Sequence, residues 1–151
     1  MSNNKTIDAG KIQIAAIRTI KGNIDGSTDI DIDIIGGHHF QFELGTGINP
    51  EENVIGLQLL VDITAHDKEL KPLPLTGSYT HEIIFVIENL SEFLTKDETS
   101  PTGFLINGFL GSTLVSIAYS TVRGIIFTRT QGTSLGSVVL PVIDPKKLMG
   151  L

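Results

Sequence analysis

The chain begins with two segments in which isoleucine recurs. Residues 12–20 are rich in β-branched residues, and residues 28–34 alternate aspartate with isoleucine after a break at 22–27. Successive side chains of a strand point to opposite faces, so a two-residue period predicts a strand with one apolar face. β-branched residues favour the same conformation. These segments therefore predict one long first strand that is bent at the break.

Three further segments alternate apolar and polar residues in the same way. They are 39–44, 53–65 and 79–88. Turn residues separate them, including Pro72 and Pro74. Strands that are joined by short loops and have one polar face are typical of an antiparallel meander. The pattern predicts a four-stranded antiparallel sheet with one buried face.

The period changes after Leu90. Apolar residues then recur at helical spacing, which predicts one long helix of about 25 residues. This helix starts after Pro101 and Thr102, ends by Gly132 and packs on one face of the sheet. Asp144 and Pro145 provide an N-cap and a first-turn proline for a short C-terminal helix. The apolar residues with helical spacing are Ile106, Leu110, Leu114, Ile117, Ala118, Val122, Ile125 and Ile126.

One domain accounts for the chain. Its 151 residues suffice for one core, and no repeat or linker divides them. We therefore expect a single α+β domain over 1–151, with a disordered N-terminus at 1–10. The first residues show no secretion signal, so we expect a cytoplasmic protein. The chain has no cysteine, which excludes disulfides and thiolate chemistry.

Charge and hydropathy indicate the kind of partner. The formal net charge is -6, with only 11 lysines and arginines. Phosphate backbones would be repelled by such a chain, so we expect no nucleic-acid partner. The mean hydropathy is nevertheless positive. This predicts more apolar surface than a small domain buries alone, and self-association or a partner would cover the excess.

Residues with catalytic or metal-binding chemistry form no recognised pattern. Asp29, Asp31 and Asp33 are not followed by the glycine and the glutamate that a calcium loop requires. His38 and His39 would point to opposite faces of a strand. No serine lies in a nucleophile elbow, and no glycine-rich phosphate loop is complete. We expect no catalytic residue, no metal, no cofactor and no enzymatic activity.

An acidic face is predicted on the sheet. Asp29, Asp31 and Asp33 share one side of the predicted first strand, and Glu82 lies with Ile84 on the solvent side of the last strand. One interpretation is a solvated ladder that keeps the sheet edge from pairing with other chains. The other is a docking surface for a basic or zinc-containing partner, in which acid surrounds a small apolar centre. Both interpretations stay open here.

Small residues form a stripe on the predicted helix. Gly108, Ser112, Ser116 and Ser120 recur every four residues. A stripe of this kind lets a second helix or a sheet approach closely, so we assign it to an oligomer interface. A membrane span is an alternative, because no charged residue occurs over 104–122. The polar stripe and the apolar sheet face that needs a cover favour an interface helix, and we expect no membrane insertion.

Short segments near the C-terminal end carry a family resemblance. They are Tyr119 to Arg123, Gly132 with Thr133, and Val139 to Asp144. Together with the order of elements, they resemble the SecB family of export chaperones, which has an aromatic-x-x-x-Arg turn, a Gly-Thr exit and a proline segment before the last helix. The resemblance covers residues 11–149 in order of elements.

The resemblance implies a molecular chaperone of the holdase type. Such a protein binds unfolded or non-native polypeptides, here called clients, and serves protein export or a toxin–antitoxin pair. It also implies a homotetramer that is a dimer of dimers. Aromatic residues suit a groove for clients because they make no fixed hydrogen-bond demands, although each would fill the core equally well. The candidates for this groove are Phe40, Phe42, Tyr79, Phe85, Phe104 and Phe109.

The partners that the resemblance implies are a SecA-like motor or an antitoxin. Glu82 falls where the family keeps an acidic contact to the motor, but Thr80 stands where the family has leucine. Ser120 replaces a proline of the helix turn. These departures leave both export and toxin–antitoxin service open. Two other classes stay open as well: a small-molecule-binding domain, and a structural oligomerisation domain without chaperone activity.

Overall fold

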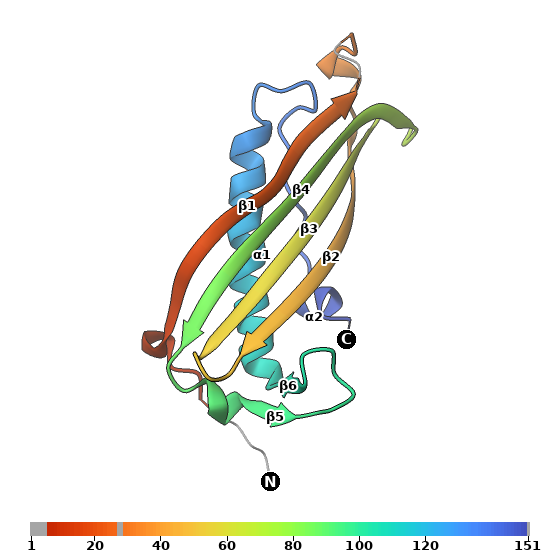
Figure 1. Cartoon of the computed structure of the whole chain (residues 1–151). Helices are drawn as coiled ribbons and strands as arrows, with labels where there is room; N and C mark the ends of the chain where they lie inside the picture. The colour runs from red at the N-terminus through yellow and green to blue at the C-terminus, as the bar shows by residue number, and fades with distance from the viewer. Residues whose placement is uncertain (1–5, 27–28, 151) are drawn as a thin grey trace.

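The protein has two layers, a four-stranded sheet and the segments that cover one of its faces (Figure 1). The computed structural model describes residues 6–26 and 29–150. Neighbouring strands are antiparallel, in the order β1-β4-β3-β2. The predicted α+β class and four-stranded antiparallel sheet are confirmed. The strands are β1 (Ile12–Gly26), β2 (Gly37–Asn49), β3 (Val54–His66) and β4 (Pro72–Ile87).

The other elements complete the covering layer and the connections. A hairpin is formed by β5 (Leu94–Lys96) and β6 (Phe104–Ile106). The long helix α1 (Gly108–Thr130) packs on the sheet, and the short helix α2 (Pro145–Leu148) follows an extended segment. The described part of the chain also contains 3₁₀ turns: η1 (Ala9–Lys11) precedes β1, η2 (Ile32–Ile34) lies between β1 and β2, and η3 (Leu90–Phe93) lies between β4 and β5.

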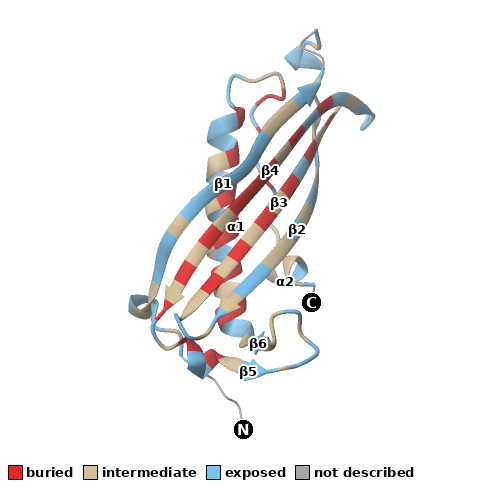
Figure 2. Ribbon diagram, in the orientation of Figure 1, coloured by how far each residue is buried: buried red, intermediate tan, exposed pale blue. Residues whose placement is uncertain are grey.

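The core lies between the sheet and α1. Every second residue of β3 is buried, and the residues between them stay open on the other face (Figure 2). On β4, Ile83 and Phe85 are fully buried. Leu110, Leu114 and Val122 of α1 are at most 1% exposed. Burial of one such side chain contributes roughly 1.5–3 kcal/mol, so this packing is the main stabilising interaction.

Helix α1 begins later than the sequence predicted. The predicted start after Pro101 and Thr102 is wrong, because β6 pairs with β5 before the helix begins. Asn107 is the N-cap, and its Oδ1 accepts hydrogen bonds from the backbone N–H groups of Phe109 at 3.0 Å and Leu110 at 3.3 Å. The predicted cap of α2 is confirmed, since Asp144 Oδ1 accepts from the Lys146 backbone N–H at 3.0 Å.

The first strand is shorter than predicted. It ends at Gly26, whose φ of 142° turns the chain away from the sheet. The predicted strand over 28–34 is wrong for its described part, because Ile32–Ile34 forms η2 and Asp31 Oδ1 accepts from the Asp33 backbone N–H at 3.0 Å. Aspartate side chains compete in this way with strand pairing. Asp29, Asp31 and Asp33 therefore do not line up on a sheet face; residues 27–28 lie outside the described residues.

The bend of β1 comes from irregular pairing with β4. The register shifts between Ile14 and Ala16 and again between Thr19 and Lys21. Such bulges increase the local twist and curve the strand, as Figure 1 shows. The bend is therefore confirmed, but it lies within the strand and not at the predicted break.

The chain is already ordered just before β1. Ile7 packs against the core, and Asp8 Oδ1 accepts from the Gly10 backbone N–H at 2.9 Å at the start of η1. The disordered N-terminus expected at 1–10 therefore does not extend over 6–10. Residues 1–5 of that prediction lie outside the described residues.

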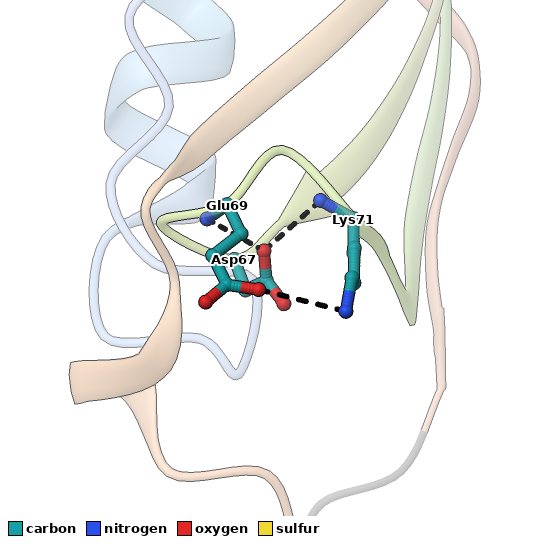
Figure 3. Close-up of polar contacts among 3 residues, drawn as sticks. All are labelled: Asp67, Glu69 and Lys71. Atoms are coloured by element: carbon teal, nitrogen blue, oxygen red, sulfur yellow. Dashed lines mark hydrogen bonds and ion pairs between the residues drawn. The ribbon is translucent and has the colours of Figure 1, made fainter.

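The turn between β3 and β4 is built around Asp67 (Figure 3). Its Oδ1 accepts from the backbone N–H groups of Glu69 at 2.8 Å and Lys71 at 2.9 Å. The hydrogen bond from Lys71 is the main reason that the pKa of Asp67 lies below its usual value. An exposed ion pair joins Lys71 Nζ to Glu69 Oε2 at 3.5 Å. These contacts close the hairpin whose strands carry most of the core.

His81 is a buried histidine on the covered face of β4. It is 0% exposed, and neither ring nitrogen has a hydrogen-bond partner among the described residues. The ring stacks on Tyr79 with 6.3 Å between centroids. Burial lowers the pKa of His81 below the usual 6.5, and the charge of Arg129 adds to this shift. The imidazole is therefore neutral in the folded chain near pH 7.

We predict that His81 makes the fold sensitive to acid. Below about pH 6.5 the His81 imidazole is protonated in the unfolded chain but still neutral in the folded chain. Falling pH therefore favours unfolding until the pH reaches the lowered pKa of the folded chain. The limiting slope is about 1.4 kcal/mol per pH unit. The substitution His81→Leu should flatten the dependence of the unfolding free energy on pH between 7.5 and 5.5. His39→Gln, at an exposed position of β2, should leave it unchanged. Equal slopes in wild type and His81→Leu would contradict the prediction.

Candidate functional site

A groove opens on the covered face of the sheet, at the end where α1 begins. Its volume is about 650 Å³, and it lies between β2, β3, the β5–β6 hairpin, the first half of α1 and α2. Among the residues that the structure describes, none of those that line it is charged. Apolar side chains predominate, and the few polar lining groups include Thr46, Ser100 and Thr102. We refer to this feature as the groove.

The sheet supplies the floor of the groove, and α1 supplies one wall. Leu44 and Ile48 of β2 line the groove together with Leu57 of β3. Gly111 and Leu114 of α1 form the wall. The strand residues reach the groove because the apolar alternation of the sheet continues beyond the part that the helix covers.

The β5–β6 hairpin forms the rim beside α1. Its loop is stabilised by Asp97, whose Oδ1 accepts from Thr99 Oγ1 at 2.6 Å and from the Thr99 backbone N–H at 2.9 Å. Both hydrogen bonds lower the pKa of Asp97, and the one from Thr99 Oγ1 has the larger effect. The backbone N–H of Asn107 donates to Phe93 O at 2.8 Å and ties the hairpin to the start of α1. Leu105, on the rim, is 53% exposed.

The C-terminal segment closes the opposite side. A Cβ atom at Gly111 would lie 2.8 Å from Met149 Cε, so glycine allows the end of α2 to pack closely on α1. The Tyr119 hydroxyl donates to the carbonyl of Pro141. Thr130 Oγ1 accepts from the Val138 backbone N–H at 3.0 Å. These contacts hold residues 131–143 along α1 and leave Leu148 and Met149 facing the groove.

The predicted aromatic residues are only partly brought together. Phe104 lines the groove. Phe109 lies in the first turn of α1, where it is 60% exposed and does not line the groove. Tyr79 is 4% exposed and Phe85 0% exposed, so both are core residues in this conformation.

Phe40 and Phe42 belong to the neighbourhood of the C-terminal segment. Both are half-buried and pack on the core, and the Phe42 ring meets the Tyr119 ring edge to face at 5.8 Å. His38 Nε2 lies 2.8 Å from Leu135 O, which fixes the segment beside β2. Sequence reasoning missed most of the aliphatic lining, because Leu44, Leu105 and Met149 come from distant segments with no shared motif.

The predicted oligomer stripe lies on the open side of α1. Gly108, Ser116 and Ser120 are exposed and Ser112 is half-buried. The Ser112 hydroxyl donates to Phe109 O at 3.2 Å and the Ser116 hydroxyl to Ser112 O at 2.7 Å, so these two hydroxyls are satisfied within the helix. Phe127, in the last part of the helix, is 40% exposed.

The predicted docking residues do not form one cluster. Glu82 and Ile84 lie on the uncovered face of the sheet, where Glu82 Oε1 is 3.3 Å from Arg18 Nη1. Asp29, Asp31 and Asp33 lie in the connection between β1 and β2. The residue set predicted from the sequence is therefore split between a sheet face and a loop.

Two further features bear on function. Within the described residues, no group of three or more histidine or acidic side chains could hold a metal ion. Helix α1 is long and apolar enough to cross a membrane by length and composition, and 44% of its apolar stretch is buried within the protein. The core helix of a soluble protein satisfies the same criteria.

Comparisons with known proteins support one fold. No protein-family model and no curated protein matches the sequence. The Mycobacterium tuberculosis Rv1957 SecB-like chaperone, solved in complex with a ChAD peptide from the Rv1956 HigA1 antitoxin, superposes with a TM-score of 0.63 over 89% of this chain and 92% of that chain. The fold is SecB-like. Sequence identity is 14%, so the similarity concerns the fold.

A second solved structure is less similar. It is a protein of unknown function from Streptococcus agalactiae, with a TM-score of 0.41 and 9% identity over 87% of this chain and 97% of that chain. The SecB-like arrangement of sheet, long helix and short C-terminal helix agrees with the resemblance seen in the sequence.

Proposed function

We propose that this protein is a cytoplasmic chaperone of the holdase type, which binds non-native polypeptide in the groove. The observation that carries the proposal is an uncharged, mainly apolar groove of about 650 Å³ on a SecB-like fold. Apolar side chains that a client exposes before it folds would be buried there. The binding energy would come from the apolar area removed from water, which does not depend on one client sequence.

The composition of the groove favours polypeptide over a small metabolite. Sites for small molecules place a few polar groups so that they converge on the ligand. Here Thr46 is on the floor whereas Ser100 and Thr102 are on the rim, and Thr102 Oγ1 already donates to Phe104 O at 3.0 Å. An adaptable apolar surface of this kind suits clients of varying sequence.

The client class includes antitoxin segments. The SecB-like neighbour was solved with an antitoxin peptide, and this supports the binding of an antitoxin segment. Service in protein export is kept as the alternative role. A functional assembly would be a homo-oligomer, with the dimer of dimers as the proposed form. Apolar surface remains for it, because Ile14 and Ile17 of β1 are 46% and 47% exposed on the sheet face that α1 partly covers.

A second surface suits a basic partner. The uncovered face of the sheet carries Ile84 and Val86 beside the carboxylate of Glu82, and no helix covers this face in Figure 1. Acid around a small apolar centre steers a basic partner and gives it an apolar contact. We include this face as a docking site for a SecA-like motor or another basic protein, separate from the groove.

If clients bind in the groove, a charge on its rim should prevent the suppression of aggregation. Wild type should suppress aggregation of an unrelated, chemically unfolded protein, measured by light scattering after dilution. Leu105→Glu should abolish suppression, because a client would have to bury a carboxylate. Stability should change by less than about 0.5 kcal/mol because the site is exposed. Leu70→Glu, at an exposed leucine of the β3–β4 turn, is the matched control. If Leu105→Glu suppresses aggregation as well as Leu70→Glu and wild type do, the groove is excluded as the client site.

Self-association is predicted through α1. At micromolar concentration, wild type should scatter light as a dimer or tetramer. Ser116→Arg should reduce the mass, because an interface cannot readily bury an unpaired charge. Ser91→Arg, at an exposed serine outside the helix, should keep the wild-type mass. If wild type is a monomer, the assignment of the stripe is wrong.

Docking on the uncovered face should be separable from holding. A labelled lysine-rich peptide should bind wild type and weaken as salt rises. The double substitution Glu82→Lys with Ile84→Ser should abolish this binding and leave aggregation suppression intact. Loss of the exposed Arg18–Glu82 pair costs at most about 1 kcal/mol. Glu69→Lys, which changes net charge equally but lies in the β3–β4 turn, should still bind. Unchanged binding by the double variant would refute this docking site.

A further inference from the structure

The outer edge of β2 is long, regular and unpaired. The strand has 13 residues, and each pairs in turn with β3 without a register shift from Gly37 to Asn49. Among the described residues, β2 makes backbone hydrogen bonds to β3 and to no other strand or helix. Natural proteins usually interrupt such an edge with bulges, prolines or lysines, because it is a template for another strand.

The other edge of the sheet shows the usual protection. Strand β1 has two register shifts, and it carries Arg18 and Lys21. Strand β2 has no bulge, no proline and no lysine, and Glu43 is its only acidic residue. The two edges of one sheet therefore differ, and only β2 keeps a regular row of free backbone groups.

The open edge and the groove share the same residues. Leu44, Thr46 and Ile48 of β2 line the groove. The residues between them, Gly45 and Gly47, face the uncovered side, where a shallow hollow of about 490 Å³ lies. A strand added beside 44–49 would place alternate side chains in the groove and over this hollow, because the side-chain period of a strand is two.

Gly47 is not explained by the fold of the free chain. A Cβ atom there would meet no atom within 4 Å, and its φ is not in the left-handed region. Its cross-strand partner is also a glycine, Gly56. Glycine weakens the interior of a strand, and it often marks a place where another backbone or a ligand approaches closely.

We propose that a client is held as an added strand, with its backbone hydrogen-bonded to the edge of β2 at residues 44–49. The occupant is an extended, proline-free segment in which apolar side chains recur every second residue. One set of side chains enters the uncharged groove, and the other lies over Gly47. The free N–H and C=O groups of β2 indicate an occupant of this kind, because only another extended backbone can pair with them in register. This inference rests on the proposed holdase function and specifies its binding mode.

The test uses one synthetic probe and its methylated variants. The probe is an acetylated peptide that alternates leucine and serine, with a lysine at each end. Each variant carries an N-methyl group on one backbone nitrogen, which removes one hydrogen-bond donor. In an added strand, only every second N–H points to β2. Affinity for wild type should fall about tenfold at alternate positions and change little at those between.

Hydrogen exchange locates the pairing on the protein. Residues 44–49 should contain amides that exchange freely in the free chain and become protected when the probe binds. Amides of β1 should not change. Slow exchange of all amides of 44–49 in the free chain would show that another copy already occupies this edge and would overturn the proposal.

The outcomes separate the binding mode from the function. If the probe binds wild type but not Leu105→Glu, and methylation has no alternating effect, the groove function stands and strand addition is refuted. If the probe and unfolded proteins bind Leu105→Glu as well as wild type, the groove function itself fails. Alternation together with protection at 44–49 supports both.

Discussion

A single helix cannot cover a four-stranded sheet, and this mismatch of widths governs the structure. Strands lie about 4.8 Å apart, so one helix about 10 Å in diameter covers roughly two of them. Helix α1 lies over β3 and β4, whose covered faces are buried along Ile55–Ala65 and Leu75–Ile87. The outer strands β1 and β2 keep the same apolar alternation, but they extend beyond the helix. The fold must therefore either cover these flanks with other segments or leave them open.

The two flanks are treated differently. Over β2, residues 131–143 return along α1 and are held there through Tyr119 and Thr130. This cover ends at α2, and the groove is the part of the flank that it leaves open. No segment within residues 6–26 and 29–150 returns over β1, so Ile14 and Ile17 stay half exposed although their side chains point to the covered side. Exposed isoleucines on this flank are consistent with the positive mean hydropathy of an acidic chain.

The sequence predicts those parts of the fold that depend on local periodicity. Alternation along β3 and β4 assigns the buried face correctly, and Asp144 with Pro145 marks the start of α2. It fails where a side chain competes with the ladder, as Asp31 does in η2. The groove is less predictable still. Only Phe104 was expected there, because the groove results from where the covering segments end, and no local pattern reports that.

The proposed functions follow from the same incomplete cover. The groove offers a client apolar side chains that folding leaves uncovered. The edge of β2 offers unpaired backbone N–H and C=O groups, and every polypeptide has a backbone that can pair with them. A site with the proposed binding mode would discriminate between unfolded and folded proteins and hardly between sequences, because a folded partner has already paired its backbone and buried its apolar side chains. Selectivity for one client would then have to come from elsewhere, either from the uncovered sheet face around Ile84 or from the length of client that an oligomer can engage.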